Sequence, residues 1–139
     1  MLRLGRLPDY GLVIATVFVD AEGLLTTKDI TQRSKIPLAT VRKLLKYLVD
    51  AGLIKSFRGN KGGYTLARPA TEISVADIIQ AIDGPIALTD CSGINPDNQC
   101  SLEASCPLAH KWCEINKEIV AKLQSVSIKE ITTSASISL

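Results

Sequence analysis

All the cysteines of the chain lie within one short polar stretch. They stand at Cys91, Cys100, Cys106 and Cys113, and the only histidine, His110, lies among them. The stretch is rich in Ser, Asn, Asp and Pro and has few apolar residues, so it cannot order itself by burying its own surface. The sequence therefore predicts a loop that needs something else to order it, and a metal centre would supply that order.

The spacing of these cysteines favours an iron–sulfur cluster over a zinc ion. Eight residues separate Cys91 from Cys100 and five separate Cys100 from Cys106, which is not the paired C-x2-C spacing of zinc fingers and ribbons. Three thiolates on an irregular loop suit a cluster, because its irons take ligands from several directions. Zinc stays as the less favoured metal, and reactive or structural thiols are a further alternative.

Charge is distributed unevenly along the chain. The net charge is only +2, but residues 1–68 hold twelve Lys and Arg against five Asp and Glu, and residues 69–139 hold four against nine. A basic first half suits a polyanion such as DNA. With 46% hydrophobic residues, the 139 residues can build one compact domain, or a small domain plus an oligomerising arm.

The N-terminus imitates a secretory signal only faintly. Arg3 and Arg6 precede an apolar run at residues 10–19, but Asp9 opens that run and no A-x-A-like cleavage site follows it. The run is also far shorter than the roughly 20 residues of a membrane span. We therefore expect a cytoplasmic protein without a membrane partner, where clustered thiols stay reduced and more often hold metal.

Hydrophobic periodicity predicts a helix-turn-helix in the basic half. Residues 10–21 have helical spacing, a short helix follows an N-cap at Thr26 or Thr27, and a third helix starts at Pro37 and stops at Gly52. The predicted buried stripe of this third helix is Val41, Leu44, Leu45 and Leu48. Its other face is cationic, aromatic and hydrogen-bonding, as expected of a helix that enters a DNA major groove.

A β-hairpin is predicted directly behind the third helix. Residues 53–58 and 64–68 have the composition of strands around a glycine-rich turn, so the hairpin would be a wing whose cations meet phosphates or a narrow minor groove. The candidate DNA-binding residues are Lys28, Ala39, Thr40, Arg42, Lys43, Lys46, Tyr47, Arg58, Asn60 and Lys61. Thr40 and Arg42 are the candidates for base edges, while the lysines suit phosphates equally well.

Helices are also predicted on both sides of the cysteine stretch. Ser74 and Asp77 cap a helix that stops at Gly84, and Ser127 with Glu130 caps a last short turn. From Pro107 a narrow apolar stripe is typical of a helix–helix seam. Its residues are Leu108, Trp112, Ile115, Ile119 and Leu123.

The predicted fold is mostly α with a small β-hairpin wing: a winged helix-turn-helix plus a long C-terminal dimerisation helix. The expected division is a DNA-binding domain at 1–84, a cysteine-rich cluster-binding loop at 85–106, and the dimerisation helix and tail at 107–139. No phosphate loop, paired catalytic carboxylates or nucleophile elbow is present in the sequence, so we expect no enzyme.

These motifs together resemble the IscR-like family of winged-helix iron–sulfur transcription regulators, which includes cluster-assembly regulators and nitric-oxide-sensing repressors. The resemblance rests on IPLATVRKLLKYLVDAGLIKS, the wing RGNKGGY, the helix ISVADIIQAIDG and the three spaced cysteines, and it spans residues 4 to about 123. It implies a homodimer, swapped through the C-terminal helix, whose cluster state controls binding to a double-stranded DNA operator. The expected function is that of a repressor that senses cluster, redox or nitric oxide status.

The resemblance also implies the ligands of a 2Fe-2S or 4Fe-4S cluster. Cys91, Cys100 and Cys106 match the three cysteine ligands of the family. In the assembly-regulator branch a histidine follows the third cysteine after two residues, but Ala109 stands at that position and His110 comes one residue later.

Three residues are candidates for the fourth ligand. In the nitric-oxide-sensing branch an aspartate at the start of the first helix is supplied by the partner subunit, and Asp9 falls at the matching place. Cys113 is a further thiol, but seven helical residues put it roughly 10 Å along the axis from Cys106. We rank Asp9 of the partner subunit first, His110 second and Cys113 third.

Two other functions stay open. One is a winged-helix regulator whose effector is zinc or a small metabolite. The other is a metal-storing or thiol-redox protein that does not bind DNA and whose basic face is a solvated surface. A redox enzyme would more usually carry C-x-x-C, and that spacing is absent from the sequence, so the regulator is preferred.

Overall fold

The protein is mostly helical, with one antiparallel hairpin, as predicted. The structure is a computed structural model that describes residues 1–93, 100–102 and 104–137. Its elements in chain order are α1 (Arg6–Val19), α2 (Thr27–Ser34), α3 (Leu38–Asp50), β1 (Ile54–Phe57), β2 (Gly63–Leu66), the 3-10 turn η1 (Ala70–Glu72), α4 (Val75–Asp83), the 3-10 turn η2 (Asp90–Ser92), α5 (Ala109–Ser125) and α6 (Ile128–Ile137). Within the described residues, no helix has the length and apolar character needed to span a membrane.

The helix-turn-helix is fixed by local hydrogen bonds at α2. The Asp29 backbone N–H donates to Thr26 Oγ1 at 3.1 Å, and the Thr26 backbone N–H donates to Asp29 Oδ2 at 3.0 Å. This capping box confirms the predicted N-cap and satisfies amides that have no partner inside the helix. Lys35 then adopts a left-handed conformation, with φ of 63°, which ends α2 and turns the chain toward Leu38.

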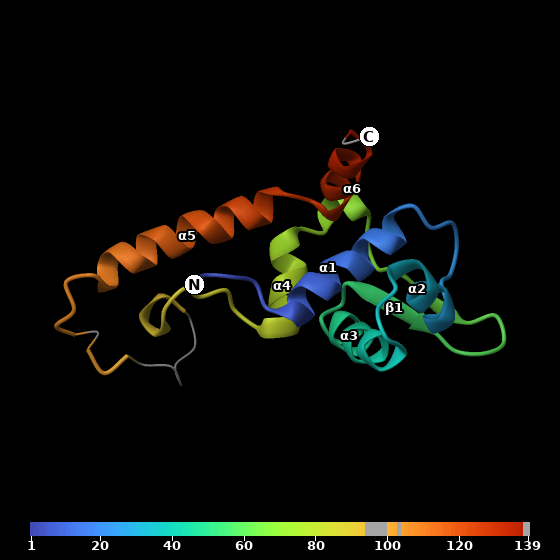
Figure 1. The fold of residues 1–139 in the computed structure, drawn as a ribbon, viewed down its shortest axis with the longest axis horizontal. Helices are drawn as coiled ribbons and strands as arrows, with labels where there is room; N and C mark the ends of the chain where they lie inside the picture. The colour runs from blue at the N-terminus through green and yellow to red at the C-terminus, as the bar shows by residue number, and fades with distance from the viewer. Residues whose placement is uncertain (94–99, 103, 138–139) are drawn as a thin grey trace.

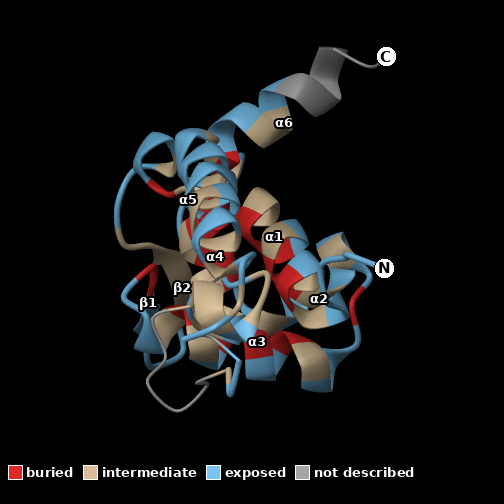
Figure 2. Cartoon of the chain, turned by 90° about the vertical axis from the view of Figure 1, so that its left-hand side faces the viewer, coloured by how far each residue is buried: buried red, intermediate tan, exposed pale blue. Residues whose placement is uncertain are grey.

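The core lies where α1, α3 and α4 meet, as Figure 2 shows by its buried residues. The stripe predicted for α3 is confirmed: Val41, Leu44, Leu45 and Leu48 are each at most 1% exposed. Gly11 lets α1 approach α4 closely, because a Cβ at this position would collide with Ile82 Cδ1. The winged-helix part is therefore built around a closely packed core.

The C-terminal end of the chain returns to this core through α6. Ile128 is fully buried, and its backbone N–H donates to the Ile73 carbonyl oxygen at 2.9 Å. Ser127 Oγ accepts from the Glu130 backbone N–H at 3.1 Å, as the predicted cap requires. The helix runs for ten residues rather than one short turn, because packing against α1 stabilises a segment whose own pattern is weak.

In contrast, α5 extends away from the core and leads to the cysteine stretch (Figure 1). It begins at Ala109 rather than at Pro107, since residues 107 and 108 form a turn before the first helical residue. Its predicted apolar stripe is partly uncovered in the single chain: Leu108, Ile115 and Ile119 are 56%, 37% and 36% exposed. α5 thus carries an apolar surface that this chain does not cover.

Candidate DNA interface and cysteine loop

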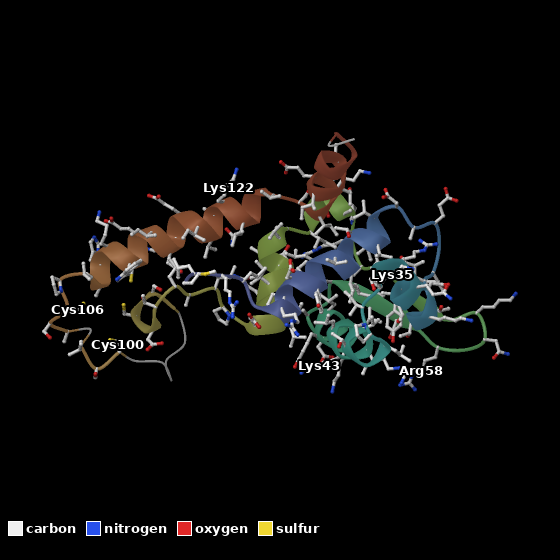
Figure 3. The ribbon with its side chains drawn as sticks, viewed as in Figure 1. Lys35, Lys43, Arg58, Cys100, Cys106 and Lys122 are labelled. Atoms are coloured by element: carbon white, nitrogen blue, oxygen red, sulfur yellow. The ribbon has the colours of Figure 1, made fainter. Side chains whose placement is uncertain are left out.

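The predicted DNA-binding side chains lie on exposed surface of the helix-turn-helix and the hairpin. We call this set the basic face: Lys28, Ala39, Thr40, Arg42, Lys43, Lys46, Tyr47, Arg58, Asn60 and Lys61, all exposed except the half-buried Thr40 and Tyr47. Lys43 and Arg58 lie toward the same end of the molecule in Figure 3. Among the residues that the structure describes, no ion pair engages a cation of the basic face, so these charges are available to an anion.

The wing is held against the helix-turn-helix by two backbone hydrogen bonds. The Leu25 N–H donates to the Tyr64 carbonyl oxygen at 2.9 Å, and the Tyr64 N–H donates to the Leu25 carbonyl oxygen at 2.8 Å. A Cβ at Gly63 would lie 2.7 Å from the same Leu25 oxygen, and Gly63 has φ of 154°. Gly63 of the wing motif therefore allows the hairpin to approach the segment that leads into α2.

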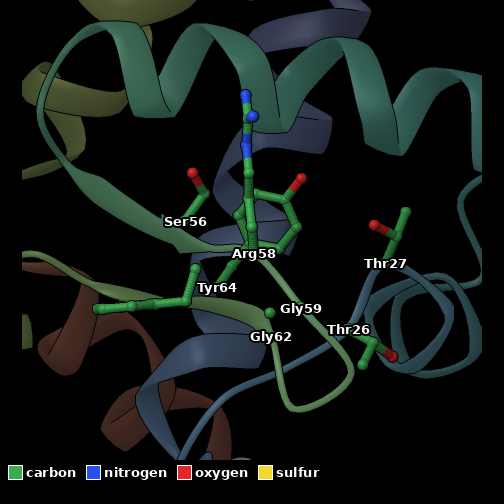
Figure 4. Close-up of a pocket in the computed structure, with 9 residues that line it drawn as sticks. Thr26, Thr27, Ser56, Arg58, Gly59, Gly62 and Tyr64 are labelled. Atoms are coloured by element: carbon green, nitrogen blue, oxygen red, sulfur yellow. The ribbon is translucent and has the colours of Figure 1, made fainter.

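A polar groove of about 410 Å³ separates the start of α2 from the hairpin. Figure 4 shows Thr26 and Thr27 across this groove from Ser56 and Arg58. The strand register pairs Ser56 with Tyr64, which also lines the groove. Hydroxyl and guanidinium groups are common phosphate partners. Sequence reasoning named Arg58 but missed the hydroxyls of Ser56 and Tyr64, because only the strand register brings these two residues opposite α2.

A second groove lies between the two helices of the helix-turn-helix. Lys28 of α2 and Arg42 of α3 line it together with Gln32. Lys28 and Arg42 stand on different helices, so the periodicity of one helix does not align them. The tight turn at Lys35 brings them to one surface. The structure thus places Lys28 and Arg42 beside one groove, although they stand on different helices.

Cys91 and Cys113 lie side by side although 21 residues separate them. The Cys113 Sγ donates to the Cys91 carbonyl oxygen at 3.4 Å, and Cys91 Sγ shares a hydrogen bond of 3.3 Å with Thr89 Oγ1. Cys100 and Cys106 lie on the loop at the opposite end of the molecule from Arg58 (Figure 3). All the thiols are free and half-buried.

The donor set fits an iron–sulfur cluster by its chemistry, since the loop offers several free thiols and no disulfide. The described side chains are not already gathered around one point: among residues 1–93, 100–102 and 104–133, no group of three or more His, Cys, Asp or Glu is placed to hold a metal ion. Residues 94–99 and 103, which lie between the predicted ligands, fall outside the described residues.

The predicted alternatives for the fourth ligand differ in their surroundings. His110 is 88% exposed, and its Nε2 lies 3.0 Å from Glu114 Oε1. Glu114 Oε2 also accepts from Lys111 Nζ at 2.6 Å, and this hydrogen bond is the largest of the effects that lower the pKa of Glu114. Asp9 is exposed in the first turn of α1 and lines an open groove with Arg3 and other residues of the N-terminal segment.

Sequence reasoning missed Asn116, the buried polar residue in the described part of the chain, which is 6% exposed. Its side chain makes three hydrogen bonds to backbone groups of segment 86–92. A signal was present in the sequence, because asparagine is a poor helix former and here stands in the middle of a helical pattern. Periodicity alone does not say what such a side chain contacts.

The chain is similar over most of its length to known transcriptional regulators. The family described as Rrf2, iron-dependent transcriptional regulator, matches residues 7–134. The HTH-type transcriptional regulator IscR of Photorhabdus laumondii is 32% identical over 131 residues, which cover 91% of this chain and 78% of that protein. Protein rrf2 of Nitratidesulfovibrio vulgaris is 33% identical over 117 residues, which cover 84% and 77%.

A solved structure with a closely similar fold is that of CymR, the global cysteine regulator of B. subtilis. It has a TM-score of 0.73 at 28% identity and covers 96% of this chain and 98% of its own. The structure of T. potens IscR has a TM-score of 0.70 at 27% identity, with 96% and 88% covered. These relatives are regulators rather than enzymes, and the fold, the wing and the matched range agree. The chain therefore belongs to the Rrf2 family and is a winged helix-turn-helix transcriptional regulator.

Proposed function

We propose that this chain is a dimeric repressor whose affinity for a DNA operator depends on an iron–sulfur cluster held by its cysteine loop. The observation that carries the proposal is the separation of two sites. Unpaired cations face outward at one end of the molecule, and free thiols lie at the other end, joined to the winged-helix domain through α5.

In the proposed complex with DNA, α3 enters the major groove. Thr40 and Arg42 stand in its first half and contact base edges, while Lys43 and Lys46 contact phosphates. At the wing, Arg58 contacts a phosphate at the groove that Thr26, Thr27 and Ser56 line. This assignment is supported by the exposure of the cations and by the absence of ion pairs on the basic face among the described residues.

The homodimer is proposed from the uncovered stripe on α5. Leu108, Ile115 and Ile119 repeat at helical spacing and stay partly exposed in the single chain. A second α5 packed on this stripe would bury them, as in other helix–helix seams. In this arrangement residues 1–84 read DNA, 85–106 hold the cluster and 107–139 supply the dimer contact with the tail.

For the cluster we propose Cys91, Cys100 and Cys106 as ligands. When bound, the cluster supplies a centre that changes charge or is lost on oxidation or on reaction with nitric oxide. Asp9 of the partner subunit, His110 and Cys113 remain the candidates for the fourth ligand. The contact of Cys113 with Cys91 supports Cys113 over His110, whose imidazole faces Glu114 and solvent.

The test begins with anaerobic purification, an absorption spectrum, and iron and sulfide analysis. We expect sulfide-to-iron charge-transfer absorption in the wild type and its loss in Cys100→Ala. Asp9→Ala, His110→Ala and Cys113→Ala, prepared in the same way, identify the fourth ligand by shorter cluster lifetime. Equal operator affinity of the intact wild type and Cys100→Ala would overturn cluster control.

DNA contacts are tested separately by the salt dependence of binding. Arg58→Ala should lower the slope of log affinity against log salt by about one, because one phosphate contact is lost. Lys122→Ala is the matched control and should leave the slope unchanged, since Lys122 lies on α5 rather than on the basic face. Equal slopes in both variants would remove Arg58 from the interface.

A second candidate is a regulator of the same fold whose effector is zinc or a small metabolite. It is favoured by the likeness to the B. subtilis protein named as the global cysteine regulator. It predicts no iron or sulfide in the anaerobic preparation, while the operator binding and the effect of Arg58→Ala remain.

A further inference from the structure

Asn116 joins the cysteine loop to α5 through three of the four hydrogen bonds that its side-chain amide can make. The Leu88 backbone N–H donates to Asn116 Oδ1 at 2.9 Å. Asn116 Nδ2 donates to the Ile86 carbonyl oxygen at 3.0 Å and to the Ser92 carbonyl oxygen at 3.3 Å. One side chain therefore binds three backbone groups spread over segment 86–92.

The chemistry of this contact is specific to an amide of this length. Segment 86–89 has no helix or strand, so its backbone groups depend on partners outside the segment. An apolar side chain at position 116 would leave those groups without partners in a half-buried place. A carboxylate would keep the acceptor for Leu88 but would set oxygen against the two carbonyl oxygens.

The same face of α5 also contacts the first cysteine of the loop. Cys113 stands three residues before Asn116, which places the two side chains on one side of the helix. The Cys113 Sγ reaches the Cys91 carbonyl oxygen, and Asn116 binds the carbonyl oxygen of the next residue, Ser92. Cys91 is thus fixed by contacts that converge on two consecutive peptide units.

We propose that Asn116 is a positioning residue that fixes segment 86–92 on α5 and thereby sets the place of the Cys91 thiol. Its consequence for cluster retention rests on the proposed function, but its effect on the thiol does not. Because Asn116 stands on α5, a rearrangement of segment 86–92 would shift the helix that carries the apolar stripe. A shift of α5 would in turn move segment 86–92.

The first experiment measures thiol reactivity in the reduced, metal-free protein. Asn116→Ala and the nearly isosteric Asn116→Asp are treated with iodoacetamide, and the alkylation of each cysteine is followed by mass spectrometry. We expect Cys91 to react about tenfold faster in both variants, because loss of the buried hydrogen bonds opens segment 86–92 more often. Cys100, which Asn116 does not contact, is the internal reference and should be unchanged.

Lys117→Ala is the matched control, because it changes the neighbouring exposed residue of the same helix. Hydrogen exchange separates local from global effects: the Leu88 amide should exchange faster in the Asn116 variants, while amides of α3 keep the wild-type rate. Unchanged alkylation of Cys91 in Asn116→Asp, or equal acceleration at Cys91 and Cys100, would overturn the positioning role.

The second experiment measures cluster loss to an iron chelator without oxygen. We expect loss about tenfold faster in Asn116→Asp than in the wild type and in Lys117→Ala. A wild type that holds no cluster would overturn the proposed function, and the alkylation result would still decide the role of Asn116. Equal loss rates from a loaded wild type and from Asn116→Asp would overturn the coupling to the cluster.

Discussion

The winged-helix domain and the cysteine arm, which consists of the cysteine stretch and α5, differ in how far they bury their apolar side chains. In the winged-helix domain α1, α3 and α4 close a core within one chain, where Leu44 is 0% exposed. On the arm, Ile119 remains 36% exposed and the thiols form no disulfide. The first region thus buries its apolar side chains within one chain, whereas the second leaves apolar side chains partly exposed and its thiols free.

The two regions also differ in what sets their geometry. The helix-turn-helix is positioned by bonds between near neighbours, such as the reciprocal pair of Thr26 and Asp29. The arm is positioned by contacts between residues more than twenty apart, such as Asn116 with Leu88 and Cys113 with Cys91. Long-range contacts of this kind are the ones that a change in the loop can break without unfolding the core.

The largest expected effect is on the closed core. Leu44→Ala should lower the free energy of unfolding by about 2–5 kcal/mol, because a fully buried leucine leaves a cavity. Urea denaturation of dilute protein measures the change. Ile119→Ala is the comparison from the arm and should have a much smaller effect. Equal losses in the two variants would mean that the arm is part of the core.

The next effect is on association. Ile119→Lys should weaken the proposed dimer about tenfold or more, because a charge would be buried in the helix–helix seam. Sedimentation at several protein concentrations gives the dissociation constant. Lys117→Ala on the same helix is the control, since its exposed side chain lies two residues from Ile119 and so on the other side of α5. A dimer of unchanged strength in Ile119→Lys would place the interface elsewhere.

A smaller effect is expected at the start of α2. Thr26→Ala should cost about 1 kcal/mol of unfolding free energy, because the Asp29 amide loses its acceptor. Ser125→Ala on α5 removes an exposed hydroxyl that donates to the Lys122 carbonyl oxygen and should cost less. Thermal unfolding of both variants tests whether local bonds contribute more in the winged-helix domain than on the arm.

The smallest effect is the pH dependence that the carboxylates of Asp29 and Glu114 give to the unfolding free energy. The hydrogen bond from the Thr26 backbone is the largest of the effects that lower the pKa of Asp29 below 3.8, and the hydrogen bond from Lys111 is the largest of those that lower the pKa of Glu114 below 4.5. A carboxyl with a lowered folded pKa stabilises the protein above its unfolded value, and this stabilisation is lost as pH falls through the folded pKa.

Unfolding free energies measured between pH 5 and about pH 2 test this dependence. Asp29→Asn should remove the loss of unfolding free energy below pH 3.8 that the carboxyl of α2 causes. Glu114→Gln should remove the loss below pH 4.5 that the carboxyl of α5 causes. If Asp29→Asn kept the wild-type dependence of stability on pH through this window, the assignment of that dependence to the α2 cap would be wrong.

Most of the winged-helix fold was predictable from local patterns. The stripe ending at Leu48, the cap at Thr26 and the glycine-rich hairpin were confirmed because each depends on neighbouring residues and on periodicity. The ten-residue α6 was expected only as a short turn, since its order comes from packing of Ile128 into a core formed by earlier elements.

For the two candidate sites, the sequence indicated which residues carry suitable chemistry but not how those residues are arranged in space. The cations of α3 were identified by their place opposite a buried stripe, whereas Ser56 and Tyr64 came to the wing groove through strand register. The cysteines Cys91, Cys100 and Cys106 remain predicted ligands. Their relative placement depends on a loop that no periodic pattern describes.

The sequence by itself determined the type of each local element and which residues carry charge or thiol chemistry, because helical spacing, capping and glycine turns act over a few residues. Only the tertiary structure decided that Asn116 binds segment 86–92 and that Cys113 lies against Cys91. Such pairs are set by how α5 packs on the returning chain. Their energy comes from satisfying buried backbone groups at long range, which no local pattern encodes.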